Sequence, residues 1–170
     1  KITVAPQVLR LPQTAKYYAQ DNYDELWEHA MAAAKELGAQ YDSDKYEFAG
    51  VSFKEVYSGW AGLANLGAKK FWLDGYWGAD PRVIAHEIGH NLGCSHATND
   101  VGGYIQGRFT NSHGWRFNVT NQGNTYPMRT IMAYGAGPRL GYYSNPRVSI
   151  WGSPAGNAAF ADNANTISNT

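Results

Sequence analysis

Apolar residues recur at helical spacing near the start of the chain, behind a short alternating segment. Residues 2–9, ITVAPQVL, alternate apolar and other side chains and predict a first strand, which Pro6 confines to an edge or a bend. From Asp21 onward the spacing becomes that of an amphipathic helix, which we expect to run to Leu37 and end at Gly38. The apolar stripe of this helix comprises Leu26, Ala30, Ala34 and Leu37, with Trp27, Met31 and Ala33 beside it.

The next segment consists of strand-like runs separated by glycines. Residues 46–53, YEFAGVSF, predict a strand, and a hinge at Ser58–Gly59 leads to two more strands near residues 60–66 and 68–73. Asp80–Pro81 then begin a second helix, with the aspartate as N-cap and the proline as first helical residue. The apolar residues of this helix, which can pack against a sheet, are Val83, Ile84, Ile88 and Leu92.

The second half of the chain has fewer periodic patterns. Residues 97–129 are polar and glycine-rich, and they contain one possible short strand at 115–119. An apolar run follows at Thr130–Tyr134, and no internal repeat is present. We therefore expect this half to be largely irregular.

Composition narrows the class of protein. A chain of 170 residues is most simply a single domain, 1–170, and its one cysteine excludes an intrachain disulfide. Lys plus Arg and Asp plus Glu number 14 each, so the balance of charge favours neither nucleic acid nor an anionic membrane as partner. The sequence shows no signal peptide or transmembrane run and begins at Lys1, so we expect a mature fragment of a longer precursor.

The segment His86–His96, HEIGHNLGCSH, contains the candidate chemistry. Histidines at i and i+4 lie one above the other on a helix, so His86 and His90 can direct their imidazoles at one point. His96 follows six residues later, where an unbroken helix would carry it away. Gly93 resolves this, because glycine readily adopts the left-handed conformation that ends a helix and turns the chain back. Three neutral imidazoles and one open position are typical of a catalytic zinc site.

Glu87 follows the first of these histidines but lies about a quarter turn away around the helix axis. A carboxylate there can contact a zinc-bound water, which is the position of a general base. The residue frequencies of this chain give the five fixed positions a chance occurrence of roughly one in 10⁵ chains of this length. Cys94 lies between ligand positions, and we interpret it as a small buried thiol, with a metal ligand or redox group as the less common alternative.

The extended zinc motif and a second segment together resemble the metzincin clan of zinc endopeptidases. Thr130–Tyr134, TIMAY, looks like the methionine turn that follows the zinc helix in this clan. Gly59–Ala64 and Tyr142–Pro146 extend the likeness to bacterial gametolysin-like or reprolysin-like members. The residue after the third histidine is Ala97, which differs from the Asp, Glu, Ser or Pro of the best-known families, so the subfamily stays open.

The resemblance implies an α+β fold in two parts. An upper subdomain, 1–93, would contain an N-terminal twisted mixed β-sheet with two helices, the second bearing the zinc motif. A smaller, irregular lower subdomain, 94–170, would contain the methionine turn, with Met132 as an apolar floor beneath the histidines. Residues 161–167 resemble the start of a metzincin C-terminal helix that is cut short.

The resemblance also locates the substrate. In metzincins the strand nearest the cleft is an antiparallel edge, a role that we assign to Ala61–Leu66, with a short covered edge strand as the alternative. Gly135–Tyr143 would form the far wall of the pocket for the side chain after the scissile bond. Within this wall we expect Arg139 to be solvated rather than to enter the pocket. The residues expected to pair with substrate are Ala61, Gly62, Leu63 and Ala64.

Tyr134 has two interpretations. In astacin-like and serralysin-like metzincins a tyrosine two residues after the turn methionine binds zinc in the resting state and swings to stabilise the oxyanion. Tyr134 follows Met132 at this spacing, so the resemblance implies the same role. The alternative is that Tyr134 is a core or pocket-wall residue. For calcium the candidate oxygen ligands are Asp74, Asn99 and Asp100, but no EF-hand or nonapeptide pattern is present, so we expect solvated loop residues. His113 is likewise expected to be an ordinary loop residue.

The sequence therefore predicts a secreted zinc endopeptidase that hydrolyses internal bonds of proteins, with Glu87 as general base. Metzincins are generally made as zymogens, so the resemblance implies a removed signal peptide and an inhibitory pro-segment. We expect a monomer with protein or peptide substrates. Two alternatives remain: a zinc-stabilised binding module, suggested by the aromatic content, and an interaction domain that works through a partner. The intact motif disfavours both.

Overall fold

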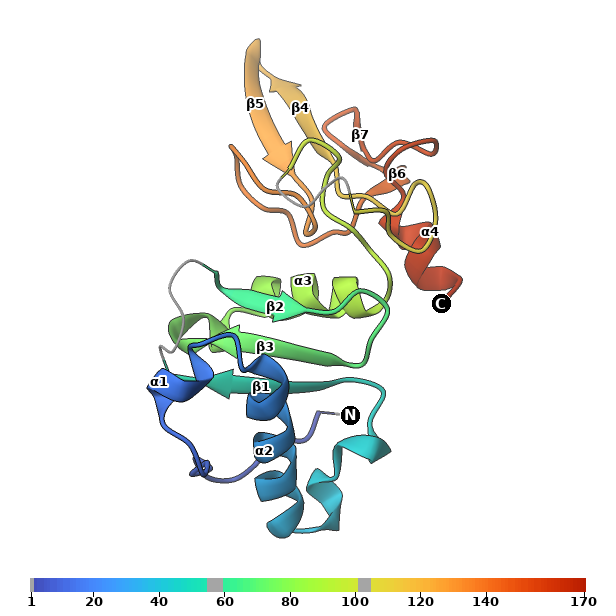
Figure 1. The fold of residues 1–170 in the computed structure, drawn as a ribbon. Coiled ribbons are helices and arrows are strands. Elements are labelled where there is room, and N and C mark those ends of the chain that lie inside the picture. The colour runs from blue at the N-terminus through green and yellow to red at the C-terminus, as the bar shows by residue number, and fades with distance from the viewer. Residues whose placement is uncertain (1, 55–59, 101–104) are drawn as a thin grey trace.

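A three-stranded mixed sheet forms the centre of the first half of the molecule in a computed structural model, which describes residues 2–54, 60–100 and 105–170 (Figure 1). Its order is β1-β3-β2, with β1 (Ala49–Phe53) parallel and β2 (Gly62–Ala64) antiparallel to the central β3 (Lys70–Asp74). The expected strands are therefore present, and β2 lies at one edge. The expected hinge at Ser58–Gly59 lies outside the described residues.

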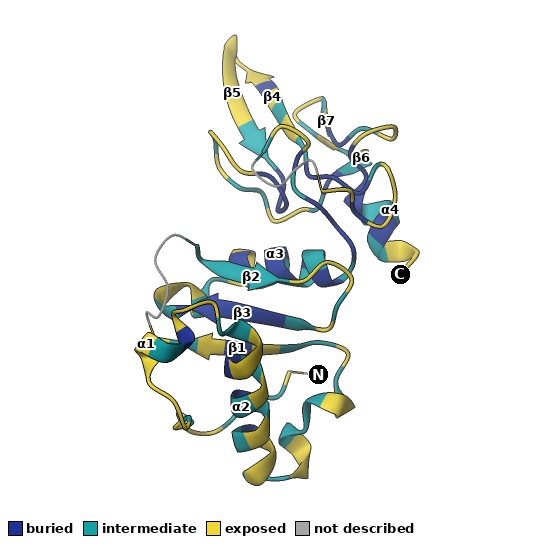
Figure 2. Ribbon diagram, viewed as in Figure 1, coloured by how far each residue is buried: buried dark blue, intermediate teal, exposed yellow. Residues whose placement is uncertain are grey.

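Helices cover both faces of this sheet because the side chains of β3 alternate between them. Trp72 packs with residues of α1 (Ala15–Tyr18) and α2 (Tyr23–Glu36), whereas Phe71 and Leu73 pack against α3 (Pro81–Asn91). Figure 2 shows the result, with β3 buried along most of its length. The mixed sheet with its two main helices was thus predicted correctly. Short 3-10 turns at Ala39–Tyr41, Ser43–Lys45 and Gly75–Ala79 complete this half.

The predicted strand at residues 2–9 is wrong. This segment forms no strand, and most of its apolar side chains are open to solvent, with Ile2 91% and Val8 94% exposed. Pro6 removes one backbone donor, and no neighbouring strand offers the segment a partner within the described sheet. Alternation alone does not make a strand when there is no buried face for the apolar side chains to cover.

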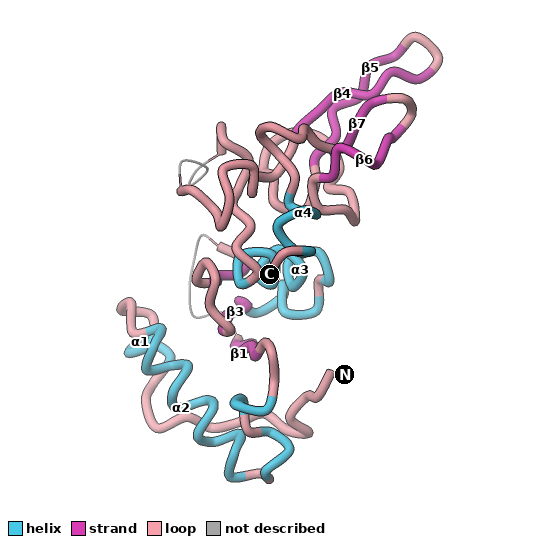
Figure 3. The backbone as a smooth tube through the Cα atoms, turned by 90° about the vertical axis from the view of Figure 1, so that its right-hand side faces the viewer, coloured by secondary structure: helices cyan, strands magenta, loops and turns pink. Residues whose placement is uncertain are grey.

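The second half is built from two hairpins, a short helix and loops. β4 (Arg116–Asn121) pairs with β5 (Asn124–Arg129), and β6 (Asn145–Ile150) pairs with β7 (Ser153–Ala155), which lies beside β4 (Figure 3). The strand predicted at 115–119 corresponds to β4, whereas β5 was missed. Helix α4 (Asn163–Ser168) follows these hairpins. No described helix combines the length and apolar character needed to cross a membrane.

Candidate metal centre

Helix α3 is fixed at its start by its own cap and along its length by the sheet. The Asp80 side chain accepts a hydrogen bond of 2.8 Å from the Arg82 backbone N–H, and Pro81 occupies the first turn. Near the other end, the Asn91 amide donates to the carbonyl oxygens of Asn65 (3.1 Å) and Lys70 (2.9 Å). These contacts hold the helix in one position relative to β2 and β3, so the side chains that it presents are fixed as well.

The helix ends in a Schellman motif centred on Gly93. This glycine has φ +88°, its N–H donates to the His90 carbonyl (2.8 Å), and the Cys94 N–H donates to that of Gly89 (2.9 Å). The φ value lies in the left-handed region, where a side chain is strained. The chain therefore turns sharply at this point and returns His96 to the two helical histidines.

The three histidines converge on one point. Their candidate ligand atoms all lie within 4.8 Å of one another, with Nε2 of His96 3.1 Å from Nε2 of His86 and 2.9 Å from Nε2 of His90. A tetrahedral zinc with bonds of about 2.0–2.1 Å holds its nitrogen ligands roughly 3.3 Å apart. The set therefore fits a single metal ion. Among the residues that the structure describes, it is the one group of three or more potential ligands this close together.

Backbone carbonyls fix the tautomers of the two helical histidines. Nδ1–H of His86 donates to the Ile131 carbonyl, and Nδ1–H of His90 donates to that of Cys94, each at 2.9 Å. Both Nε2 lone pairs are thereby free to face the metal position. Burial, followed by the charge of a neighbouring histidine, lowers the pKa of His86 well below its usual value and that of His90 to about 4. Both imidazoles are thus neutral, which is the form that binds a metal.

His113 lies beneath the third histidine, and sequence reasoning missed it. It is 7% exposed, and its Nδ1–H donates to the His96 backbone carbonyl at 2.8 Å. His113 lies outside the named strands and helices, as expected of a loop residue, but it is buried rather than solvated. The segments that contain His96 and His113 come together through a β-bridge between Ser95 and His113. These residues are 18 positions apart in the chain, so no short-range spacing in the sequence predicts the contact.

Glu87 lies beside the histidines and against the edge strand. It is 3% exposed, and a Cβ atom placed on Gly62 of β2 would come within 2.5 Å of its Oε1. The glycine therefore leaves the space that the carboxylate fills. Burial raises the pKa of Glu87 to about 8, while the charge of Arg139 acts in the opposite direction.

Met132 is fully buried against the same helix. A Cβ atom on Gly89 would lie 2.5 Å from its sulfur and 2.9 Å from Cε1 of Tyr143. Glycine costs about 1 kcal/mol relative to alanine within a helix, but here it allows this close approach. The Tyr143 hydroxyl donates to the Ala85 carbonyl at 2.5 Å and ties the following loop to α3. Cys94 is also fully buried and packs with Met132, as expected of a small apolar thiol.

Tyr134 directs its hydroxyl at the cluster from outside α3. The hydroxyl oxygen lies 3.2 Å from Nε2 of His86, and the ring centroid lies 4.7 Å from that of His96. Its backbone N–H donates to Oδ2 of Asp100 at 2.7 Å, and Oδ1 of that aspartate lies 3.4 Å from Arg116. Tyr134 is thus held at both ends of the residue, by its main chain and by its hydroxyl.

Two aspartates expected to be solvated are buried instead. The Asp100 side chain is 3% exposed, and it contacts the Tyr134 N–H and the Arg116 guanidinium. Asp74, at the end of β3, is 7% exposed. Asn99 is exposed, as expected. Arg139, which we expected to be solvated, is half-buried, and its guanidinium carbon lies 5.7 Å from the centroid of the Tyr134 ring.

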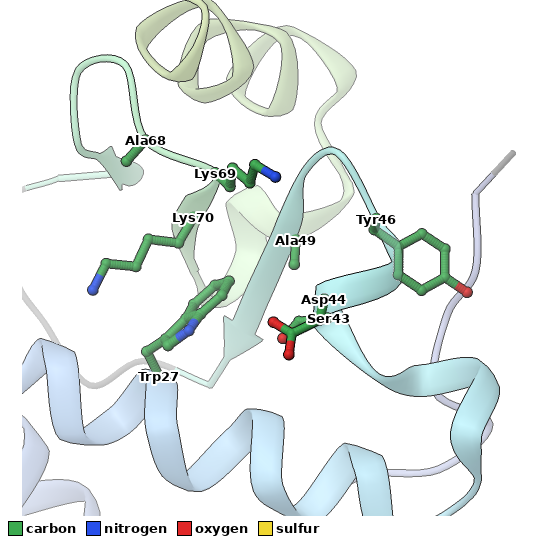
Figure 4. A pocket seen from close by; sticks show the side chains of 8 residues that line it. All are labelled: Trp27, Ser43, Asp44, Tyr46, Ala49, Ala68, Lys69 and Lys70. Atoms are coloured by element: carbon green, nitrogen blue, oxygen red, sulfur yellow. The ribbon is translucent and has the colours of Figure 1, made fainter.

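A separate shallow pocket lies on the α2 side of the sheet. It has a volume of about 290 Å³, and Figure 4 shows Trp27 of α2, Asp44 and Lys70 of β3 among the side chains around it. None of the residues that line it belongs to the histidine cluster. The candidate chemistry therefore lies on the other face of the sheet, where α3 packs.

Known proteins resemble this chain in sequence and in fold. A peptidyl-Asp metalloendopeptidase of Xanthomonas campestris pv. campestris is 43% identical over 91 residues, which is 51% of this chain and 19% of the relative. One of Stenotrophomonas maltophilia strain K279a is 41% identical over 94 residues, which is 51% of this chain and 20% of the relative. The chain thus spans about a fifth of the length of these relatives.

A solved structure described as that of a chaperone-substrate complex matches with a TM-score of 0.51. The match covers 82% of this chain and 22% of the other, and at 17% identity it shows a likeness of fold alone. The pattern that defines metallo-peptidase family M12 matches residues 15–144, the part that contains the sheet, α3, the three histidines and Tyr134. The chain therefore belongs to metallo-peptidase family M12.

Proposed function

We propose that this chain is the catalytic domain of a zinc endopeptidase that hydrolyses internal peptide bonds of proteins. The observation that carries the proposal is the convergence of three imidazoles beside a buried glutamate that lies against a sheet edge. A set of three imidazoles suits zinc, which at catalytic sites takes three protein ligands and a water. Family membership supports the same chemistry.

Glu87 is the general base in this proposal. A zinc ion held by the three histidines would polarise the scissile carbonyl and acidify the attacking water. Glu87, which burial alone would keep mostly protonated at neutral pH, would be ionised beside a bound cation. Its carboxylate then accepts the proton from that water and delivers it to the leaving amine. The position of Glu87 against Gly62 supports this role, because the proton transfer would then occur next to the strand on which we expect the substrate to lie.

We assign substrate binding to the edge strand β2. Its three residues pair with β3 on one side, through Gly62 with Leu73, Leu63 with Trp72 and Ala64 with Phe71. Its other side has no strand partner in the described part of the chain. An extended peptide can pair with that side as a further strand, which would bring its backbone past Glu87.

Tyr134 and Met132 complete the proposed machinery. The Tyr134 hydroxyl, 3.2 Å from a histidine ligand atom, is placed to donate a hydrogen bond to the developing oxyanion. We propose that Thr130–Tyr134 is a methionine turn with Met132 as the floor, which its complete burial supports. Residues 1–93 and 94–170 would then be the two subdomains. Secretion and release from an inhibitory pro-segment are further parts of this proposal, supported by the metzincin resemblance.

The relatives named peptidyl-Asp metalloendopeptidases suggest the substrate. We propose that this chain also cleaves next to aspartate. The test is digestion of a denatured protein by the wild type and by Glu87→Gln, with Glu47→Gln, at an exposed glutamate, as matched control. Zinc content is measured on all three proteins, and the new peptide ends are sequenced.

The wild type and the Glu47→Gln protein should cut, and Glu87→Gln should not, with one zinc in each protein. If no protein cuts although all hold zinc, the enzyme proposal fails and a zinc-stabilised binding module replaces it. Cutting by Glu87→Gln at the wild-type rate would remove that residue from the mechanism. New peptide ends that show no preference for aspartate would contradict only the proposed cleavage next to aspartate, not the proposed peptidase activity.

A further inference from the structure

A cationic side chain next to the metal centre has no anionic partner among the described residues. It is Arg139, and we propose that its guanidinium binds the side-chain carboxylate of the substrate residue that follows the scissile bond. This inference rests on the proposed function, because it assigns one of the residues that would select aspartate. It makes Arg139 a specificity residue in contact with substrate.

Arg139 lies close enough to the site to touch a bound peptide. Its guanidinium carbon is 5.7 Å from the ring centroid of Tyr134, whose hydroxyl is 3.2 Å from Nε2 of His86. Its charge is also felt at Glu87, where it opposes the rise in pKa caused by burial. A single aromatic ring thus separates the cation from the metal position. A peptide whose carbonyl lies at that position would place an adjoining side chain within reach of Arg139.

The guanidinium is partly desolvated and incompletely bonded. Arg139 is half-buried, and its Nε–H is buried without a hydrogen-bond partner. Burial, followed by the charge of Arg129, lowers the pKa of Arg139. A buried donor without a partner is costly, so such groups in native proteins call for an explanation. A substrate carboxylate, which accepts two parallel hydrogen bonds from a guanidinium, would satisfy this donor.

The acidic groups nearby are already engaged. Asp80 is held by both Nε and a terminal nitrogen of Arg82, at 3.1 and 2.8 Å, and it also caps α3. Asp100 accepts from the Tyr134 N–H and lies 3.4 Å from Arg116. Glu87 faces the edge strand at Gly62. The charge of Asp80 acts on Arg139, but no ion pair to Arg139 forms within 4.0 Å in the ranges that the structure describes. Within these ranges the guanidinium is left without a bonded carboxylate, which a substrate side chain could supply.

A second arginine keeps the loop around Arg139 in place. Arg129 donates from Nε to the Gly137 carbonyl (2.9 Å) and from a terminal nitrogen to the Ala133 carbonyl (3.0 Å). The main chain adds bonds from Leu140 N–H to the Arg129 carbonyl and from Arg129 N–H to the Pro138 carbonyl. Arg129 is thus committed to structure, whereas Arg139 is presented on a fixed loop. A preformed cation favours an acidic side chain and disfavours a basic one.

The first test compares two fluorogenic peptides with Asp or its neutral isostere Asn on the amine side of the scissile bond. Zinc-loaded wild type should show a kcat/KM for the Asp peptide about 10- to 100-fold above that for the Asn peptide, the scale of one hydrogen bond to a charged group. In Arg139→Gln the ratio should fall to within about threefold, mainly through loss on the Asp peptide. Arg139→Lys should recover part of the ratio, because it keeps the charge but not the planar pair of donors.

Arg10→Gln is the matched control, since it removes a charge of the same sign from an exposed residue that takes no part in the proposed site. It should keep the Asp preference. Binding supplies a second measurement: in a Glu87→Gln background, calorimetry compares Kd for the intact Asp and Asn peptides with and without Arg139→Gln. Zinc content is checked on every protein. The same 10- to 100-fold preference should appear in Kd and disappear with Arg139.

An Arg139→Gln protein that still prefers Asp by the wild-type factor in both assays overturns the inference. A wild type that cleaves the two peptides equally well also overturns it, while leaving the proposed peptidase intact. If the wild type cleaves neither peptide, the proposed function fails. In that case calorimetry on the zinc-loaded protein still decides, since equal Kd values for the two peptides would reject Arg139 as a carboxylate-binding residue.

Discussion

Helix α3 and the described loops on either side of the β4–β5 hairpin (95–100, 105–115 and 130–143), here called the irregular segment, both contribute to the candidate site, but they hold their side chains by different means. In α3, intrahelical hydrogen bonds and apolar packing on the sheet place His86, Glu87 and His90. In the irregular segment, individual polar contacts position the side chains. One example is the hydrogen bond that the Asp100 carboxylate accepts from the Tyr134 N–H. The helix tolerates the loss of one contact better, because its geometry is maintained by many equivalent bonds.

The two regions also depend on each other. The carbonyls that fix the tautomers of the helical histidines come from Ile131 and Cys94, both outside the helix. Conversely, Gly89 of the helix leaves the space that the Met132 side chain fills, and the Ala85 carbonyl of the helix accepts a hydrogen bond from the Tyr143 hydroxyl. Variants in each region should therefore affect metal binding, catalysis and stability to different degrees.

The largest effect is expected from His90→Ala, which removes a ligand within the regular helix. The two remaining histidines should leave the protein with less than about a tenth of the wild-type zinc, since structural and catalytic sites need at least three protein ligands. Peptidase activity should fall with the metal. Zinc is measured by mass spectrometry after dialysis. His29→Ala, at a histidine of α2 bonded to Tyr18, serves as control and should retain one zinc.

Full zinc occupancy in His90→Ala would mean that the three-histidine set is not the binding site. A chelator should likewise abolish activity of the wild type, and added zinc should restore it. Activity that survives complete removal of the metal would contradict the mechanism proposed for Glu87.

The next effect tests the irregular region. Tyr134→Phe removes only the hydroxyl and keeps the main-chain bond to Asp100, so zinc content and stability should be unchanged. We expect kcat to fall about 10²-fold, the usual loss when one oxyanion donor is removed, with little change in KM. Tyr142→Phe, at an exposed tyrosine, should behave like wild type. Near wild-type kcat in Tyr134→Phe would make this tyrosine a pocket-wall residue.

His113→Ala should weaken zinc binding rather than abolish it. Its Nδ1–H supports the backbone carbonyl of His96, so its loss loosens the third ligand without removing it. Outer contacts of this kind typically change metal affinity by 10- to 100-fold, and we expect the lower end because the bond reaches the backbone, not the imidazole. Competition with a chromophoric chelator measures the affinity. An unchanged zinc Kd would show that the Ser95–His113 bridge alone positions His96.

The same contrast explains which features the sequence could predict. The helices α2 and α3 and the three strands of the sheet follow from spacing within a few residues, and so does the left-handed Gly93. His113 and Asp100 act through partners distant in the sequence, where spacing carries no signal. Strand β5 was missed because its turn is Gln122–Gly123 rather than Asn-Gly and because Pro127 lies within the strand.

The smallest effect is expected at Gly93, the residue that joins the two regions. It and Gly67 both have positive φ, +88° and +71°, but they differ in their surroundings. A Cβ on Gly93 would meet Cβ of Arg108 at 2.8 Å, whereas one on Gly67 would meet nothing within 4 Å. Gly67→Ala should therefore cost only the backbone strain, about 1 kcal/mol. Gly93→Ala should cost roughly 1 kcal/mol more because its contact adds overpacking.

Urea denaturation of the two variants measures this difference directly, because the strain of the left-handed backbone is common to both and cancels. Equal free energies of unfolding would show that the chain near Arg108 yields to the added methyl group. Zinc content then shows whether the segment near Arg108 or the turn at Gly93 has moved. If Gly93→Ala keeps its zinc while Gly67→Ala is equally stable, the irregular segment has moved and the turn has not. If zinc is lost without a loss of stability, the turn itself has opened and His96 has left the other two histidines.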